Sequence, residues 1–293
     1  MTTSQDKAII RPYIHENEEN KLVRFTIGKA AMEPLALGNI KLSIHPITIA
    51  IWLAVSSACI QLLNWWPDPK IGILGYFRPL PILAAAFLPF VFFFDWYQRP
   101  TYNQQTIDIL SQPDINDIKG YYSRGPSTGL WIYEYGQNFV GLVAIDTANT
   151  DARIEIPETP LTTTTPTAVS GNNGNSKSKK SGESKSKKEQ PKSSPSSSSP
   201  VALIRHLYVS EPYRVTHAQD DLIQFAAKRI FTETDKERIV IRCNSLFDYL
   251  TSGLKKAGFE LIDKSKTEGW LGLGWPTYTY ELTRGKWSAL QKN

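Results

Sequence analysis

Two apolar stretches near the N-terminus constrain this chain more than any other feature. Residues 42–67 contain no Asp, Glu, Lys or Arg over 26 positions, and residues 79–94 contain none over 16. The first stretch is apolar around every face of a helix, whereas a surface helix of a soluble protein carries one apolar stripe. A helix that crosses a bilayer needs about 20 such residues. The sequence therefore predicts two transmembrane helices, over about residues 44–66 and 77–97.

A short loop between the two stretches joins them into a hairpin. Pro67, Pro69 and Gly72 interrupt the helical pattern there. Pro89 lies inside the second stretch, where we expect a kink, and Asp95 ends its apolar run. Two alternatives stay open, a helical hairpin buried in a soluble core and a re-entrant hairpin that enters one leaflet. In both alternatives the two flanks of the hairpin lie on the same side.

Basic residues around the hairpin predict its orientation. Five lie on the flanks and two in the loop, namely Lys21, Arg24, Lys29, Lys41 and Arg99 against Lys70 and Arg78. Cytoplasmic segments beside membrane helices carry an excess of Lys and Arg. We therefore expect a multi-pass protein with both flanks in the cytosol and membrane lipid as a partner. The sequence does not indicate an oligomeric state.

The net charge of +5 is concentrated in one low-complexity segment. Residues 160–200 hold seven lysines and two glutamates, so the rest of the chain is neutral and offers no basic face for nucleic acid. Residues 158–200 have too few apolar side chains to offset the backbone entropy of folding, and we predict that they are disordered. No Cys–His group has metal-ligand spacing, so no metal site is expected.

Outside these segments, strand and helix patterns alternate. The predicted strands cover residues 8–13, 130–135, 138–145, 202–209, 238–242, 259–262 and 278–282, and the predicted helices cover 18–37, 113–122, 222–230 and 247–257. Asp114 is interpreted as the N-cap of the second helix, and Gly136 with Gln137 as a tight hairpin turn. This alternation predicts an α+β domain in which helices flank a mixed sheet.

The predicted domain is interrupted twice. Residues 1–41 hold its first strand and helix, residues 42–97 the hairpin, and residues 98–157 its second helix and central strands. The disordered insertion covers residues 158–200, and residues 201–293 hold the remainder.

The order of elements resembles the GNAT superfamily of acyl-CoA-dependent N-acetyltransferases. LWIYEYGQNFVGLVAID (130–146) is similar to the second and third strands of that family, and IRHLYVSEPYR (204–214) to its fourth strand and the turn into the cofactor loop. KKAGFELI (255–262) is similar to the end of its fourth helix and the next strand. The resemblance implies a GNAT-like mixed sheet, with the transmembrane hairpin inserted between the first and second helices.

The resemblance also implies an acetyl-CoA site, whose residues are altered here. GNAT enzymes hold the CoA pyrophosphate on the main-chain N–H groups of a loop that reads Arg/Gln-x-x-Gly-x-Gly/Ala, because larger side chains block the approach. The corresponding positions are Val209, Arg214, Val215, Thr216, His217, Ala218 and Gln219. Arg214 fits the first loop position, but His217 and Gln219 replace both small residues. We therefore expect no cofactor, and acetyl-CoA only if the chain is an active enzyme.

The general acid of the family is also replaced. GNAT enzymes use a Tyr five residues before the Phe of a Gly-Phe pair, and counting back from Phe259 gives Leu254, which has no proton to donate. His206 and Glu211, near the fourth strand, are the candidate catalytic bases, since His titrates near neutral pH. A structural role is the alternative for each. The sequence assigns no other catalytic residue.

The N-terminal part resembles a narrower group. IIRPYIHENEENKLVRFTIGKAAMEPLALGN (9–39) and NWWPDP (64–69) are similar to a fungal family of endoplasmic-reticulum membrane proteins required for surface delivery of an inorganic phosphate transporter. This resemblance implies a factor in the endoplasmic-reticulum membrane that supports folding or export of that transporter, with the client transporter and export machinery as partners. An active membrane-bound N-acetyltransferase is the alternative function.

Overall fold

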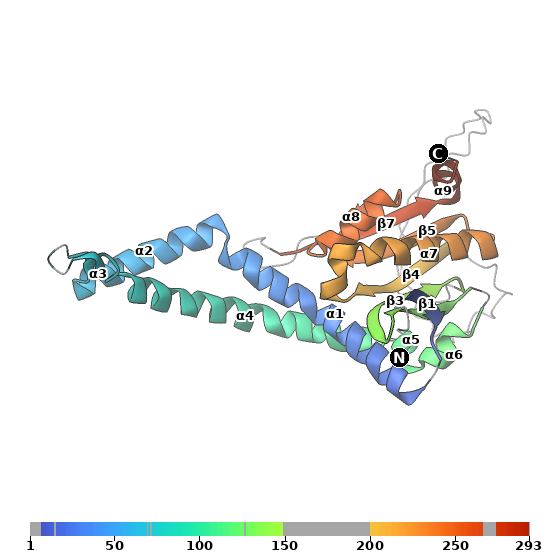
Figure 1. The fold of residues 1–293 in the computed structure, drawn as a ribbon, viewed down its shortest axis with the longest axis horizontal. Helices are drawn as coiled ribbons and strands as arrows, with labels where there is room; N and C mark the ends of the chain where they lie inside the picture. The colour runs from blue at the N-terminus through green and yellow to red at the C-terminus, as the bar shows by residue number, and fades with distance from the viewer. Residues whose placement is uncertain are drawn as a thin grey trace, which may run out of the picture. The chain divides into compact units, whose positions relative to one another are not determined.

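The computed structural model describes residues 7–14, 16–68, 70, 72–125, 127–148, 200–265 and 274–292. Apart from Pro200, the segment predicted to be disordered lies outside the described residues. Seven strands form one mixed sheet in the order β1-β2-β3-β4-β5-β7-β6 (Figure 1). The strands are β1 Ala8–Pro12, β2 Gly129–Tyr135, β3 Asn138–Asp146, β4 Val201–Val209, β5 Arg238–Asn244, β6 Glu260–Lys264 and β7 Thr277–Thr283. Each lies where the sequence predicts a strand, with ends shifted by up to two residues.

One parallel pair divides the sheet. β4 and β5 pair in parallel from Val201↔Arg238 to Ile204↔Ile241, while every other neighbouring pair is antiparallel. β2 and β3 form the predicted tight hairpin, in which Gly136 has a φ of 61° that favours glycine. The parallel pair requires a crossover, which the helix between β4 and β5 supplies.

Helices cover both faces of the sheet. One face packs against α7 Ala218–Glu233 and α8 Asp248–Lys256, and the other against α1 Asn17–Ser43, α5 Pro113–Asn116 and α6 Ile118–Tyr122. The first face buries alternate β3 residues such as Val143 and Ile145, and the second buries Leu142 and Ala144. This alternation within one strand gives the domain two cores, one on each side of β3. A last helix, α9 Arg284–Leu290, packs Trp287 on the first core.

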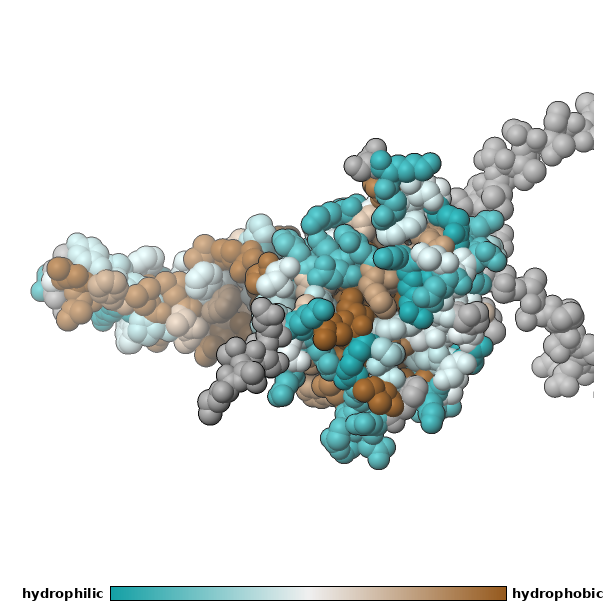
Figure 2. Space-filling model, turned by 45° about the vertical axis from the view of Figure 1, so that its right-hand side comes forward, coloured by the Kyte–Doolittle hydropathy of each residue, from teal (hydrophilic) through white to brown (hydrophobic). Residues whose placement is uncertain are grey.

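The predicted hairpin is formed by α2 Pro46–Leu63, the short α3 Ile73–Tyr76 and α4 Leu80–Leu110. Helices over Pro46–Leu63 and Ile73–Leu110 are long and apolar enough to cross a membrane, and each contains an 18-residue stretch with a mean hydropathy of 1.8. In Figure 2 the surface formed by these helices carries much of the brown, hydrophobic colour. The indole of Trp52 in α2 donates to the carbonyl oxygen of Leu83 in α4 at 2.9 Å, which holds the two helices together.

A polar cluster joins α1 to α4 where the charge-free run of α4 ends. The amide of Asn39 donates to Asp95 at 3.1 Å, and the amide of Gln98 donates to Asn39 at 2.6 Å. Arg99 pairs with the other oxygen of Asp95 at 2.7 Å. Each polar side chain of this cluster therefore has a partner, as a boundary between apolar and polar surroundings requires.

The predicted second helix differs from the structure. The helix that packs on α1 is the second half of α4, which continues to Leu110, and residues 113–122 form two short helices instead of one. Asp117 causes the break, because its backbone is non-helical and its carboxylate accepts the N–H of Gly120 at the start of α6. Asp114 is not an N-cap as predicted. It lies inside α5, fully buried, and binds side chains of β4.

Gly141 lies where β3 and β4 approach each other closely, and a substitution there tests this contact. A Cβ added there would clash with the main-chain carbonyl oxygen of Tyr208 and press on Leu222 of α7. We expect Gly141→Ala to lower the free energy of unfolding by about 1–3 kcal/mol. Denaturant unfolding followed by tryptophan fluorescence would measure this loss. Gly285→Ala is the control, since no atom lies within 4 Å of its added Cβ. Equal stability of the two variants would contradict the close approach.

Candidate functional site

The candidate site lies where β4 and β5 separate. The two strands share only four paired positions, and β4 then continues to Val209 while β5 continues to Asn244 beside β7. The chain leaves β4 through a 3₁₀ turn, Glu211–Thr216, and enters α7 at Ala218. The separated strand ends and this turn are the parts from which the cofactor site predicted by sequence would be built.

Arg214, the first residue of the predicted cofactor loop, is already paired. Its guanidinium binds both carboxylate oxygens of Glu33 in α1, at 2.5 and 2.8 Å, and its Nε donates to the carbonyl oxygen of Val209 at 3.0 Å. The guanidinium also lies 4.1 Å from the centre of the Tyr249 ring. The Arg214 and Glu33 side chains are each 16% exposed. A bidentate pair of this kind leaves Arg214 little capacity to bind a phosphate group.

His217 and Gln219 stand at the two loop positions where the GNAT pattern has a small residue, and they differ in backbone conformation and burial. His217 has a φ of 60°, the left-handed conformation that favours glycine, and it is exposed at the start of α7. Gln219 is 3% exposed, and its side-chain oxygen has no hydrogen-bond partner among the described residues. Both substitutions place a larger side chain where the GNAT loop has a small residue.

The other loop residues supply no new ligand. Val215 is 82% exposed, and Ala218 is buried in the first core. The hydroxyl of Thr216, a candidate anion donor in the sequence, donates to the carbonyl oxygen of Tyr213 at 2.8 Å. Leu254, at the position of the missing general acid, is fully buried in the first core. Burial also raises the pKa of the nearby Tyr249 phenol well above its ordinary value, which makes it a poor acid at neutral pH.

The two candidate bases do not lie in comparable surroundings. Glu211 is exposed in the turn after β4. His206 is largely buried, and its Nε2 lies 2.8 Å from the Asp114 carboxylate. The structure therefore combines His206 with an acidic residue that the sequence analysis did not place in the site, while Glu211 stays at the surface.

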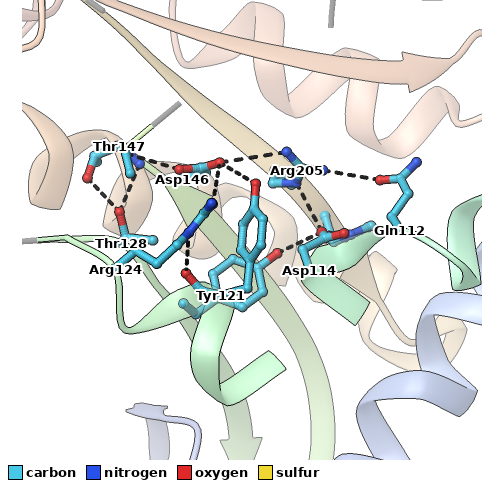
Figure 3. Close-up of polar contacts among 11 residues, drawn as sticks. Gln112, Asp114, Tyr121, Arg124, Thr128, Asp146, Thr147 and Arg205 are labelled. Carbon is cyan, nitrogen blue, oxygen red and sulfur yellow. Dashed lines mark hydrogen bonds and ion pairs between the residues drawn. The ribbon is translucent and has the colours of Figure 1, made fainter. Parts of the chain in front are cut away.

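Asp114 belongs to a buried network of charged residues (Figure 3). Its Oδ2 also accepts from Arg205 at 3.0 Å and from the Tyr122 hydroxyl at 3.1 Å. Arg205 lies 3.6 Å from a second buried carboxylate, Asp146, which accepts the Tyr121 hydroxyl at 2.7 Å. The network drawn in the figure also includes Arg124, Gln112, Thr128 and Thr147.

A β-bulge brings the side chains of Arg205 and His206 in β4 to one carboxylate. His206 pairs with Ala144 and Ile204 with Ile145, so Arg205 is the extra residue between them. A bulge lets two consecutive side chains reach the same side of a sheet. The only sequence signal for this site is the Arg205–His206 pair inside an otherwise apolar strand, because such a pair breaks the alternation of a regular strand.

The network lowers the pKa of Asp114. Burial raises this pKa, but the hydrogen bonds and charges of His206 and Arg205 outweigh burial and bring it down to about 2. The carboxylate is therefore ionised throughout the physiological range. Among the described residues, no group of three or more His, Cys, Asp or Glu side chains is arranged to hold a metal ion.

The element order and the mixed seven-stranded sheet with one parallel pair form an α+β fold, as the resemblance to the GNAT superfamily implies. Solved structures to which the chain is similar include a Streptococcus mutans UA159 protein, with 13% identity over 59% of this chain and 80% of that chain at a TM-score of 0.36. A spermidine N-acetyltransferase from Vibrio cholerae shows 12% identity over 60% and 78% at 0.37. A Streptococcus pneumoniae acetyltransferase of the GNAT family shows 9% identity over 62% and 75% at 0.35. Neither protein-family models nor curated proteins match the sequence.

We expect replacement of Asp114 to destabilise the domain in a pH-dependent way. Because the pKa of Asp114 is lower in the folded protein, its stabilising contribution is complete above about pH 4 and is lost as the pH falls toward 2. Asp114→Asn should therefore lower the unfolding free energy by about 2–4 kcal/mol at pH 7. Denaturant unfolding at pH 7, 4 and 2.5 would show the difference from the unmodified protein shrinking. Asp263→Asn, at an exposed position of β6, should show no such trend. A difference independent of pH would contradict the role of the carboxylate charge.

Proposed function

We propose that this chain is a membrane-anchored protein whose GNAT-like domain is noncatalytic. The pairing of Arg214 with Glu33 carries the proposal. The one cofactor-loop residue that fits the GNAT pattern is held by a carboxylate that would repel a phosphate. Glu33 belongs to α1, so the helix that leads into the hairpin also contacts the first residue of the predicted cofactor loop. The left-handed His217 and the buried Gln219 support the same conclusion.

The hairpin supports the membrane anchor. Large apolar side chains of α2 and α4, such as Leu53, Leu88 and Phe92, face outward and are exposed, as side chains in contact with lipid would be. The polar cluster around Asp95 lies where the apolar run ends, and we place the lipid headgroups at this level. The charge asymmetry of the sequence supports a GNAT-like domain in the cytosol.

We take the cellular role from the resemblance that residues 9–39 and 64–69 carry. We propose that the protein resides in the endoplasmic-reticulum membrane and supports folding or export of an inorganic phosphate transporter. The hairpin would contact the membrane helices of this client, and the cytosolic domain would meet the export machinery. The structure divides the small residues of α2 between two faces. Ser56 is buried inside the hairpin, whereas Ser57 and Ala58 face outward and permit close approach of another helix.

An active N-acetyltransferase is the second candidate. One observation favours it, since His206 is oriented by Asp114 in the manner of a general base. Acetyl-CoA would be its cofactor, and an amine near the bilayer surface would be its substrate. The blocked cofactor loop makes this candidate the less favoured one.

Calorimetric titration of acetyl-CoA into the detergent-solubilised full chain separates the two functions. We expect no binding at millimolar acetyl-CoA, because Glu33 competes for Arg214 and two side chains block the loop. A triple variant with Glu33→Gln, His217→Gly and Gln219→Ala should gain binding, with a dissociation constant of about 1 mM or lower.

The control for this titration is the triple variant with Arg214→Ala added, which should lose the gained binding. Fluorescence and unfolding measurements on each variant would establish that it is folded. Micromolar binding by the unmodified chain, lost on Arg214→Ala, would reject the noncatalytic proposal and favour the enzyme.

The client contact is tested at Ser57. Replacing Ser57 with Leu adds a bulky side chain to the outward face of α2, so recovery of the phosphate transporter with the tagged chain should fall about threefold, as expected for one lost interhelical contact. Ser57→Ala keeps the position small and should leave recovery unchanged. Equal recovery with both variants would remove this face of α2 from the proposed contact.

A further inference from the structure

A shallow groove runs along one face of α4 and has no role in the proposed client contact. Its volume is about 750 Å³, and it is lined by Pro89, Phe92, Phe93, Asp95, Trp96, Arg99, Pro100 and Asn103. These positions recur at three- and four-residue intervals, which places them on a single face of the helix. Phe92 and Trp96 are 72% and 73% exposed. The groove therefore offers a continuous surface that changes from apolar to polar along the helix.

The polar end of the groove presents one negative and one positive charge at the same level. Arg99 lies four residues after Asp95, but helical side chains lean toward the N-terminus, so its guanidinium meets the carboxylate at 2.7 Å. Arg99 binds Asp95 through Nε and Nη2, which leaves Nη1 for a phosphate, whereas all three guanidinium nitrogens of Arg214 are engaged. Both side chains keep access to solvent, at 55% exposure for Arg99 and 33% for Asp95. This adjacent pair complements a ligand that carries both a phosphate and an ammonium group.

The aromatic side chains of the groove suit a quaternary ammonium. The rings of Phe93 and Trp96 lie 6.4 Å apart and are tilted by 41°, and Phe93 also stacks on Tyr97. Aromatic faces attract cations, Trp most strongly, and grouped rings are used to bind choline and similar ligands. A carboxylate beside the rings, here Asp95, adds attraction for the same cation. An anionic headgroup without an ammonium would not gain from this combination.

The position of the groove fits a lipid. It crosses the residue at which the charge-free run of α4 ends, with Pro89, Phe92 and Phe93 on the apolar side and Asn103 on the polar side. From Phe92 to Arg99 the helix rises about 10 Å at 1.5 Å per residue. This distance is comparable to the headgroup layer and the outermost part of the hydrocarbon in one leaflet.

We propose that this groove binds a single phospholipid with a zwitterionic choline headgroup. Its phosphate would bind Arg99, its ammonium would lie on Trp96 beside Asp95, and an acyl chain would lie along Phe92 and Phe93. The proposal rests on the membrane anchor of the proposed function, and it adds a lipid preference to that anchor.

The test has two stages and uses the full-length chain. First, the protein is mixed with phosphatidylcholine vesicles and floated through a density gradient. Second, the protein is delipidated in detergent and titrated with phosphatidylcholine or phosphatidylglycerol of identical acyl chains, and bound lipid is counted by native mass spectrometry. We expect flotation, and at least about fivefold greater occupancy by phosphatidylcholine, the equivalent of one cation–π contact.

Two variants separate the contacts, and a third is the control. Trp96→Ala should lower phosphatidylcholine occupancy about fivefold and leave phosphatidylglycerol unchanged. Arg99→Gln should lower the occupancy of both lipids, because both carry the phosphate. Trp66→Ala removes an exposed Trp at the opposite end of the hairpin, outside the groove, and should change neither.

Each failure has a distinct meaning. Absence of flotation would overturn the membrane anchor, and the lipid site with it. Flotation with equal occupancy by the two lipids, or occupancy unchanged by Trp96→Ala, would overturn the lipid site alone. A loss of transporter recovery on Trp96→Ala with unchanged lipid occupancy would overturn it in favour of a protein partner on this face.

Discussion

The packing of α1 against α4 is the interaction on which the rest of the structure depends. Each helix begins or ends beside the sheet and continues without a break toward the hairpin, so the two together connect the folded domain to the apolar helices. At one end Leu110 lies beside Gly28, and at the other the amide of Asn39 donates to the Asp95 carboxylate and accepts from the amide of Gln98. The contact is apolar where it lies on the sheet and polar where the apolar run ends. The same pair of helices therefore serves two different surroundings.

The position of α1 also explains why Arg214, the first residue of the predicted cofactor loop, is paired with a carboxylate. Glu33 and Gly38 lie on the part of α1 that passes the end of β4 and the start of α8, where Glu33 binds Arg214 and Gly38 contacts Trp275. Lys41 of the same segment pairs with Asp248, the first residue of α8, at 3.6 Å. A carboxylate held at this place opposes a pyrophosphate on the neighbouring loop. The helix that leads into the hairpin therefore also contacts Arg214, the first residue of the predicted cofactor loop.

The sequence predicted β2, β3 and β4 because they are short, largely apolar runs, with a tight turn between β2 and β3. It predicted the hairpin because charges are absent over long runs. It did not predict the network around Asp114. An acidic residue after a proline is typical of a helix N-cap, and the partners of Asp114, Arg205 and His206, lie about 90 residues away and meet it only through the bulge in β4. The sequence likewise does not distinguish Glu33 from the other acidic residues of its predicted helix. Its contact with Arg214 depends on how α1 crosses the sheet, which local patterns do not specify.

The register of β3 and β4 has a consequence for the long segment between them. Asp146 and Leu203 pair directly, although 56 residues separate them along the chain. Since the two ends are held at neighbouring positions and we predict residues 158–200 to be disordered, we expect a change in the length of this segment to alter mainly the entropy of closing a loop, by about 0.6 kcal/mol for each doubling. The stability of the sheet therefore depends very little on the length of the insertion. Selection on its composition and length can act independently of the fold that carries it.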